Sequence, residues 1–177
     1  MSSNVTYIQG KSDTVSFGLK LASSDSFKSL FKEGMGLVEE AASYLDGDGR
    51  VESRLLQRAD ALAYASESMR LTTRLMQLAS WLLLQRAVNE GEMSQTQAAA
   101  EKHKVKLVRQ ERSSAPEAFE RLPERLQSLV QRSLRMQDRI IHLDTLLYSQ
   151  SKEAMAERPP AISQQLLLIE QAFSRAG

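Results

Sequence analysis

Residues that break helices are almost absent from the interior of this 177-residue chain. Between Arg50 and Ala176 the only glycine is Gly91, and the whole chain contains 8 Gly and 4 Pro. β-Sandwiches, barrels and parallel sheets need more turn residues, and they need more β-branched side chains than the 13 Val and Ile found here beside 25 Leu. The sequence therefore predicts an all-α fold in which two long helices flank Gly91.

The spacing of apolar residues predicts a three-helix bundle with long second and third helices. The first helix is expected over 24–45 and the second over 51–89, with the Asp-Gly-Asp-Gly-Arg run at 46–50 as the turn between them. The third is expected over 116–150, or from Pro123 if that proline occupies the first turn.

Glycine and a capping pattern add two local predictions. Gly34 and Gly36 lie inside the first helix, where each costs about 1 kcal/mol relative to alanine. A neighbouring backbone is therefore expected to approach closely there, or the helix bends. After Gly91, Ser94 and Gln97 have the spacing of a capping box, which predicts the start of a short helix.

The second helix carries two opposed apolar faces, which indicates two kinds of neighbour. One face has a row of large residues beside a row of small ones: Leu55, Leu62, Met69, Met76 and Leu83, then Ala59, Ser66, Thr73, Ser80 and Ala87. The other lies near 180° away and consists of Tyr64, Leu71, Leu75, Leu78 and Leu82. We assign the second face to a partner, with a homodimer as the hypothesis. The alternative is that the first and third helices cover both faces.

The third helix repeats the same heptad pattern. Its two rows are Leu122, Leu129, Met136 and Leu143, and Leu126, Ser133, Ile140 and Leu147. Five arginines lie off these rows: Arg121, Arg125, Arg132, Arg135 and Arg139. We interpret the rows as a core seam and the arginines as solvated or ion-paired.

A basic connector over 101–115 joins the second and third helices. Its cations are Lys102, Lys104, Lys106, Arg109 and Arg112. We predict a mobile docking site for acidic cargo. Nucleic-acid binding through 102–112 is the alternative, but no aromatic residue interleaves the charges to stack on a base.

The bundle over 24–150 is flanked by two segments that we predict to be flexible. Residues 1–23 are rich in Ser, Thr, Asn and Gly, but Val15, Phe17, Leu19 and Leu21 alternate with other residues as in an edge strand, a docking motif or an arm resting on the bundle. In the tail over 151–177, Pro159 and Pro160 break the helix. An amphipathic segment follows, with apolar residues Ile162, Leu166, Ile169 and Phe173.

Composition gives no support to catalysis or to a cofactor. The chain has no Cys and a formal charge of +1, so thiol chemistry, thiolate zinc sites and a global attraction to nucleic acid are not expected. Asp138 and His142 are one helical turn apart, but no third metal ligand has a usable spacing. We find no signal peptide and no membrane-spanning run, so we expect a soluble intracellular protein without catalytic, cofactor or metal residues.

Three stretches resemble the alphaproteobacterial regulator of CtrA degradation family. They are GMGLVEEAASYLDGDGR at 34–50, SMRLTTRLMQLASWLLLQRAVNEGEM at 68–93 and LPERL at 122–126 with the helix that follows. The likeness covers about residues 25–150, and the stretch at 68–93 is long enough to be specific.

This resemblance implies a dimeric three-helix bundle without catalytic activity that acts as an adaptor of the ClpXP protease in the cell cycle. It implies partners: ClpX primed by the response regulator CpdR, and cargo bound directly or through PopA, which delivers CtrA. It also implies a cytoplasmic protein that is concentrated at the cell pole. With it we assign Ile162, Leu166, Ile169 and Phe173 to the protease tether and the bundle surface with the 101–115 connector to cargo.

Overall fold

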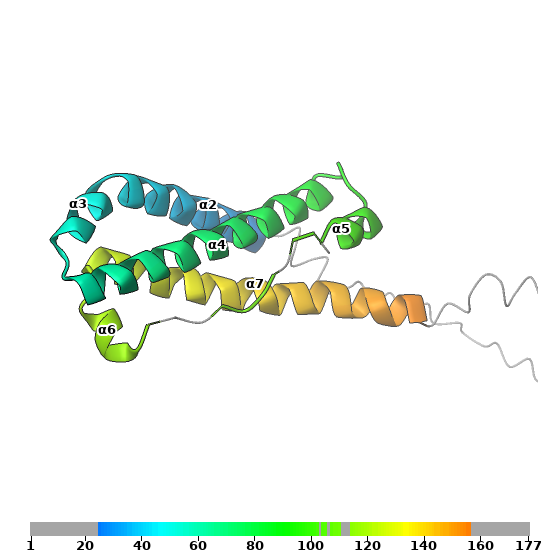
Figure 1. The fold of residues 1–177 in the computed structure, drawn as a ribbon. Helices are drawn as coiled ribbons and strands as arrows, with labels where there is room; N and C mark the ends of the chain where they lie inside the picture. Colours follow the sequence, from blue (N-terminus) through cyan, green and yellow to red (C-terminus); the bar gives the residue numbers. More distant parts are fainter. Residues whose placement is uncertain (1–24, 103, 106, 111–113, 157–177) are drawn as a thin grey trace, which may run out of the picture.

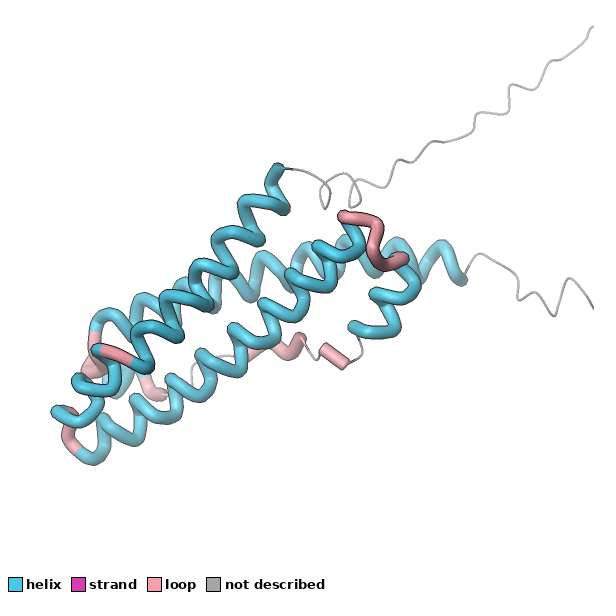
Figure 2. Tube along the Cα trace, turned by 90° about the horizontal axis from the view of Figure 1, so that it is seen from above, coloured by secondary structure: helices cyan, strands magenta, loops and turns pink. Residues whose placement is uncertain are grey.

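A three-helix bundle forms the body of the protein in the computed structural model, which describes residues 25–102, 104–105, 107–110 and 114–156. The long helices are α2 (Asp25–Asp46), α4 (Arg58–Asn89) and α7 (Glu124–Ala156). The short ones are α3 (Asp48–Leu55), α5 (Gln95–Lys102) and α6 (Pro116–Glu120). Helix α4 packs against both α2 and α7, and α3, α5 and α6 lie at the ends of the bundle (Figure 1). The described part of the chain contains helices and loops but no strand (Figure 2), so the all-α bundle is confirmed.

The predicted second helix over 51–89 is wrong at its beginning, because two helices replace the single rod. Helix α3 ends at Leu55, and Leu56 and Gln57 have extended backbone before α4 begins at Arg58. The predicted turn at 46–50 shrinks to Gly47. This arrangement folds α3 back against α2, where the buried hydroxyl group of Tyr44 donates a hydrogen bond of 2.6 Å to Glu52.

The other end of α4 agrees with the sequence. Helix α4 ends at Asn89, and Gly91 adopts a φ of +76°, a conformation that favours glycine. The backbone N–H of Ser94 donates to Gln97 at 3.0 Å, and the backbone N–H of Gln97 donates to the Ser94 hydroxyl at 3.2 Å. The predicted capping box at the start of α5 is confirmed.

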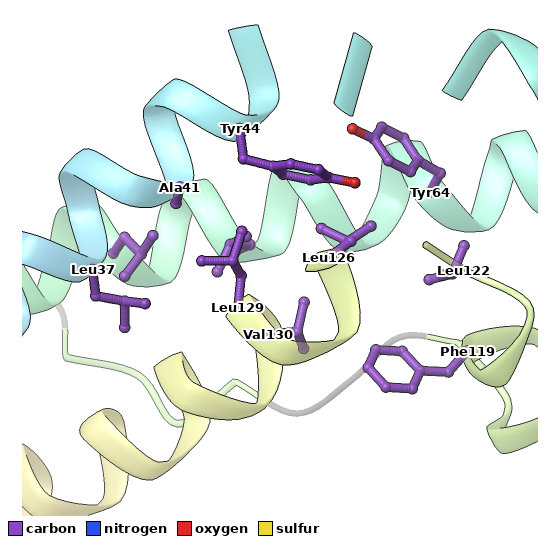
Figure 3. Close-up of a cluster of buried hydrophobic side chains, with 11 residues drawn as sticks. Leu37, Ala41, Tyr44, Tyr64, Phe119, Leu122, Leu126, Leu129 and Val130 are labelled. Atoms are coloured by element: carbon purple, nitrogen blue, oxygen red, sulfur yellow. The ribbon is translucent and has the colours of Figure 1, made fainter. Parts of the chain in front are cut away.

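The core follows the heptad rows of α7 and divides into two clusters. One surrounds Leu71, Leu126 and Leu129, and Figure 3 shows the rings of Tyr44 and Tyr64 beside each other at its edge. The other contains Phe27, Leu30, Leu78, Trp81, Leu82, Met136, Ile140 and Leu147. The predicted core seam of α7 is therefore confirmed. The helix continues to Ala156, beyond its predicted end and into the segment predicted as tail.

The two glycines inside α2 have different surroundings. A Cβ atom at Gly34 would overlap the Leu82 side chain, so the packing there is close, but it is made by a side chain and not by the neighbouring backbone that was expected. At Gly36 a Cβ atom would meet nothing within 4 Å, so close packing does not explain this glycine. Gly49 in α3 is tighter, since its Cβ would lie 2.5 Å from the Tyr64 hydroxyl and 2.8 Å from the Tyr44 carbonyl oxygen.

These surroundings predict opposite effects of alanine at two glycines. Gly36→Ala should raise the free energy of unfolding by about 1 kcal/mol, because only the helix propensity changes. Gly49→Ala should lower it by about 1–3 kcal/mol, because the Tyr44 and Tyr64 groups must move apart. Guanidinium unfolding of the two variants and the parent measures both effects. The same sign in both variants would contradict the packing at the joint between α2 and α3.

Candidate functional site

A row of large apolar residues lies exposed along one side of α4, and an exposed leucine on α3 precedes it in the sequence. Its members are Leu55, Leu62, Met69, Met76 and Leu83, which we call the exposed row. Their exposed fractions lie between 50% and 81%, values typical of charged surface residues. On α4 the spacing of seven residues from Leu62 to Leu83 keeps one side of the helix continuously apolar.

The structure exchanges the two faces that the sequence analysis assigned. Tyr64, Leu71, Leu75, Leu78 and Leu82, the predicted partner face, have exposed fractions of at most 8% and lie inside the bundle. Their assignment as a partner face is therefore corrected, since α2 and α7 already cover them. The wrong assignment of this face has a physical reason, which is a pair of charged residues in the core. Glu67 and Arg74 share the buried side of α4, where a sequence pattern gives no reason to place charges.

The surface around the exposed row carries almost no charge. Between residues 59 and 85, α4 has four charged residues: Asp60, Glu67, Arg70 and Arg74. Asp60 pairs with Arg121, Glu67 and Arg74 are buried, and Arg70 lies about 100° around the helix from the row. An exposed helix face of this length without charge is unusual for a surface that stays in water.

Hydroxyl groups flank the exposed row, and they are satisfied within the helix. The hydroxyls of Thr72, Thr73 and Ser80 each donate to the carbonyl oxygen four residues earlier, at 2.8–2.9 Å. Because these side chains are short and already hydrogen-bonded, another helix can approach α4 closely without leaving a donor unpaired.

A polar layer inside the bundle was not predicted. The guanidinium group of Arg74 donates a hydrogen bond of 2.7 Å to the Ser133 hydroxyl on α7, and both residues are fully buried. Burial lowers the pKa of Arg74, and the Glu67 carboxylate opposes this shift. Glu67 also accepts a hydrogen bond of 2.8 Å from the backbone N–H of Ser114. The sequence feature that could have indicated this layer is the charged pair Glu67 and Arg74, which lie seven residues apart on an apolar face of α4.

The connector is fastened to the bundle rather than detached from it. Besides the bond from Ser114, the Gln137 amide donates to the Gln110 carbonyl oxygen at 3.2 Å. The Lys102 ammonium group binds Asp144 at 2.6 Å, and the Trp81 indole N–H donates to the same carboxylate at 2.8 Å. Figure 1 shows the described parts of the connector running along the bundle between α5 and α6.

These contacts change the interpretation of the cargo-docking candidates. Lys102 is partly buried against Asp144, Lys104 pairs with Glu101 at 2.8 Å, and Arg109 pairs with Asp138. The prediction of a free basic run is therefore corrected for these three residues. Lys106 and Arg112 lie outside the described residues.

Four of the five arginines that lie off the heptad rows, Arg121 after α6 and three on α7, are ion-paired across the bundle, as one of the two predicted alternatives requires. Arg121 binds Asp60, Arg125 binds Asp48, Arg132 binds Glu40 and Arg139 binds Glu33, at 2.6–2.9 Å. Exposed pairs of this kind contribute about 0–1 kcal/mol each, so they add little to the stability of the bundle.

Other sites weighed from the sequence receive no support from geometry. Within the described residues, no three His, Asp or Glu side chains are placed to hold a metal ion, and Asp138 is bound by Arg109. None of the described helices has the length and hydropathy needed to span a bilayer. The arm over 1–23 and the tether candidates Ile162, Leu166, Ile169 and Phe173 lie outside the described residues.

Comparison with known proteins extends these observations. Residues 19–173 match the model of a family described as "Protein of unknown function (DUF1465)". The crystal structure of RcdA from Caulobacter crescentus CB15 is 50% identical in sequence, with a TM-score of 0.59. The match covers 73% of this chain and 96% of that one. A search of curated proteins gave no match.

Proposed function

Because the chain belongs to the DUF1465 family and is 50% identical to RcdA, we propose that it is a non-catalytic adaptor of regulated proteolysis. In its finer form, the proposal is that the protein tethers cell-cycle regulators to ClpXP primed by CpdR. Cargo binds directly or through PopA, and the adaptor works in the cytoplasm, concentrated at the cell pole. The single observation that carries this proposal is the 50% identity to RcdA over nearly the whole of that chain.

The architecture is compatible with tethering. A rigid bundle carries 24 residues before α2 and 21 after α7. A short flexible link between cargo and protease raises their effective concentration to about the millimolar range. Such an adaptor needs binding surfaces and no reacting groups.

A second copy of the chain is the partner that we propose for the exposed row. On α4 the row reads Leu62, Met69, Met76 and Leu83, which is symmetric about the midpoint between Thr72 and Thr73. In an antiparallel pair related by a twofold axis at that midpoint, each leucine meets a leucine and each methionine meets a methionine. A twofold interface requires this self-complementarity, whereas an unrelated partner does not.

The size of the exposed row also favours a partner. From Leu62 to Leu83 the row extends about 32 Å at 1.5 Å per residue, and a helix with side chains is about 10 Å wide. This corresponds to a few hundred Å² of continuous apolar surface, the size at which such patches on monomers are often functional.

Cargo docking on the connector is proposed for its exposed cations. Lys104 and Arg109 keep most of their side chains in solvent, each bound to one carboxylate of the chain. An acidic cargo surface must displace these carboxylates, which costs at most about 1 kcal/mol per exposed pair. The same pairs weaken the rival function, nucleic-acid binding through 102–112, because they neutralise charge that a phosphate backbone would need.

Deleting residues 157–177 tests the adaptor proposal and leaves α7 intact. In a reconstituted reaction with ClpXP, CpdR and a cargo protein, the deletion should return degradation to the rate without adaptor, while cargo binding is retained. A full-length control replaces the four apolar tether candidates, Ile162, Leu166, Ile169 and Phe173, with serine and should behave as the deletion does. Full stimulation by the deleted chain would refute the tether assignment.

A further inference from the structure

A hollow of about 230 Å³ opens at the end of the bundle where α2 begins, and we call it the terminal hollow. Its floor is apolar and aromatic, formed by Phe27, Leu30, Trp81, Leu143 and Leu147. Ser26 stands at its edge on α2, and His142 stands at its edge on α7. The exposed row faces away from these residues, on the side of α4 that the bundle does not cover.

We propose that the terminal hollow is a binding site for the N-terminal arm of the same chain, with Leu19 and Leu21 inserted against Trp81. The arm lies outside the described residues, and the inference stands independently of the adaptor role. Connectivity, side-chain spacing and the chemistry of the floor favour the arm as the occupant.

Connectivity places the arm at the hollow. Helix α2 begins at Asp25, and the next two residues, Ser26 and Phe27, already form its wall. Leu21 is five residues from Ser26, a distance of at most about 17 Å in extended chain. An intramolecular segment on so short a link competes at high effective concentration with any free ligand.

Spacing fits the arm to the length of the hollow. On α7 the lining runs from Arg139 to Leu147, about 12 Å at 1.5 Å per residue. In an extended segment, residues two apart point to the same side and lie about 6.8 Å from each other. Leu19 and Leu21 therefore fit together along the hollow, while Lys20 between them points to solvent.

The apolar floor of the terminal hollow favours an apolar occupant. The Trp81 indole N–H is already bound by Asp144, and Arg139 is held by Glu33, so these polar groups have partners of their own. What remains for a ligand is the small part of the aliphatic and aromatic floor that the bundle leaves open, since Trp81 is only 2% exposed and Leu143 is partly buried. Leucine side chains are apolar and can cover this surface. Binding in the hollow would explain the apolar alternation in the arm, whose function the sequence analysis left open: Val15, Phe17, Leu19 and Leu21.

The tail after Ala156 and a second copy are the other possible occupants. The tail would have to turn back along about 14 Å of α7, from Ala156 to Leu147, before reaching the hollow. A second copy pairing through the exposed row would lie along α4, on the side away from the hollow. The arm starts at the hollow itself and requires neither rearrangement.

The chain offers a direct probe, because Trp81 is its only tryptophan and it has no native cysteine. A nitroxide label on Lys20→Cys of the full-length chain should quench most of the Trp81 fluorescence, since such labels quench at short range. The matched control is the same label on Lys11→Cys, nine residues further along the arm, which should quench little. Adding Leu19→Ser and Leu21→Ser to the labelled Lys20→Cys chain should restore the fluorescence.

Three outcomes would overturn the proposal. Equal quenching from positions 11 and 20, or quenching that survives the two serine substitutions, would show that the leucines are not held in the hollow. Strong quenching from a label on Gln171→Cys, with none from position 20, would assign the hollow to the tail. Quenching of unlabelled chains by a labelled Lys20→Cys chain that also carries Trp81→Phe would assign it to a second copy.

Discussion

Replacing both Met69 and Met76 with aspartate is expected to convert a dimer into a monomer, raising the Kd for self-association at least about 100-fold, or about 2.8 kcal/mol. In the antiparallel pair that we propose, Met69 of one copy faces Met76 of the other. The double substitution therefore places four carboxylates near the twofold axis, where association would remove water from them. Sedimentation velocity over a range of micromolar concentrations measures the change.

This prediction has two controls: one checks that the variant still folds, and the other places a charge at a different surface position. Both methionines are more than 60% exposed in the single chain, so the variant should keep its helicity and its thermal midpoint as a monomer. Gln131→Asp, at an exposed site on α7, should leave self-association unchanged. A parent protein that is monomeric throughout the range, or a double variant that still dimerises, would reject the exposed row as the dimer face.

Arg74→Ala is expected to have the largest effect on stability, lowering the free energy of unfolding by about 3–5 kcal/mol. The substitution removes the hydrogen bond to Ser133 and leaves the Glu67 carboxylate buried without its neighbouring positive charge. At about 2–4 °C per kcal/mol for a chain of this length, the thermal midpoint should fall by on the order of 10 °C. Circular dichroism at 222 nm follows the transition.

Two companion variants separate charge from packing at Arg74. Arg70→Ala, one turn earlier on the exposed surface, should cost at most about 1 kcal/mol. Arg74→Met combined with Glu67→Gln should recover most of the loss, because a neutral amide still accepts the hydrogen bond from Ser114 and methionine fills the space. If Arg74→Ala is no more harmful than Arg70→Ala, the buried polar layer does not stabilise the bundle.

Helix ends were predictable where a local signal fixes them. Gly91 and the pair of Ser94 and Gln97 act on their own backbone, so their outcome does not depend on distant residues. The break at Leu56 and Gln57 has no such signal, because neither residue disfavours a helix as proline or glycine would. It depends on contacts that α3 makes with α2, above all the bond between Tyr44 and Glu52.

The basic connector is a candidate site whose contacts with distant residues could not be predicted from its own sequence. Its composition indicated positive charge, which is a property of the sequence. The carboxylates that bind it come from elsewhere: Asp144 lies 42 residues from Lys102, and Asp138 lies 29 residues from Arg109. Only the packing of α5 and the connector against α7 brings these charges together. The connector that the sequence predicts to be mobile is therefore bound to the bundle.

By itself the sequence determined the helical class, the core rows of α7, the ends of α2, the C-terminal end of α4, the start of α5 and the presence of two apolar faces on α4. These properties depend on neighbours within a few turns of the same helix. Which face of α4 enters the core was decided only by the tertiary structure. Both faces are apolar, and the choice depends on packing against α7 and the connector, which supply Ser133 and Ser114 as hydrogen-bond partners for part of the polar groups of Arg74 and Glu67. With those charges buried, the Leu and Met row is left on the surface, where we place the second copy.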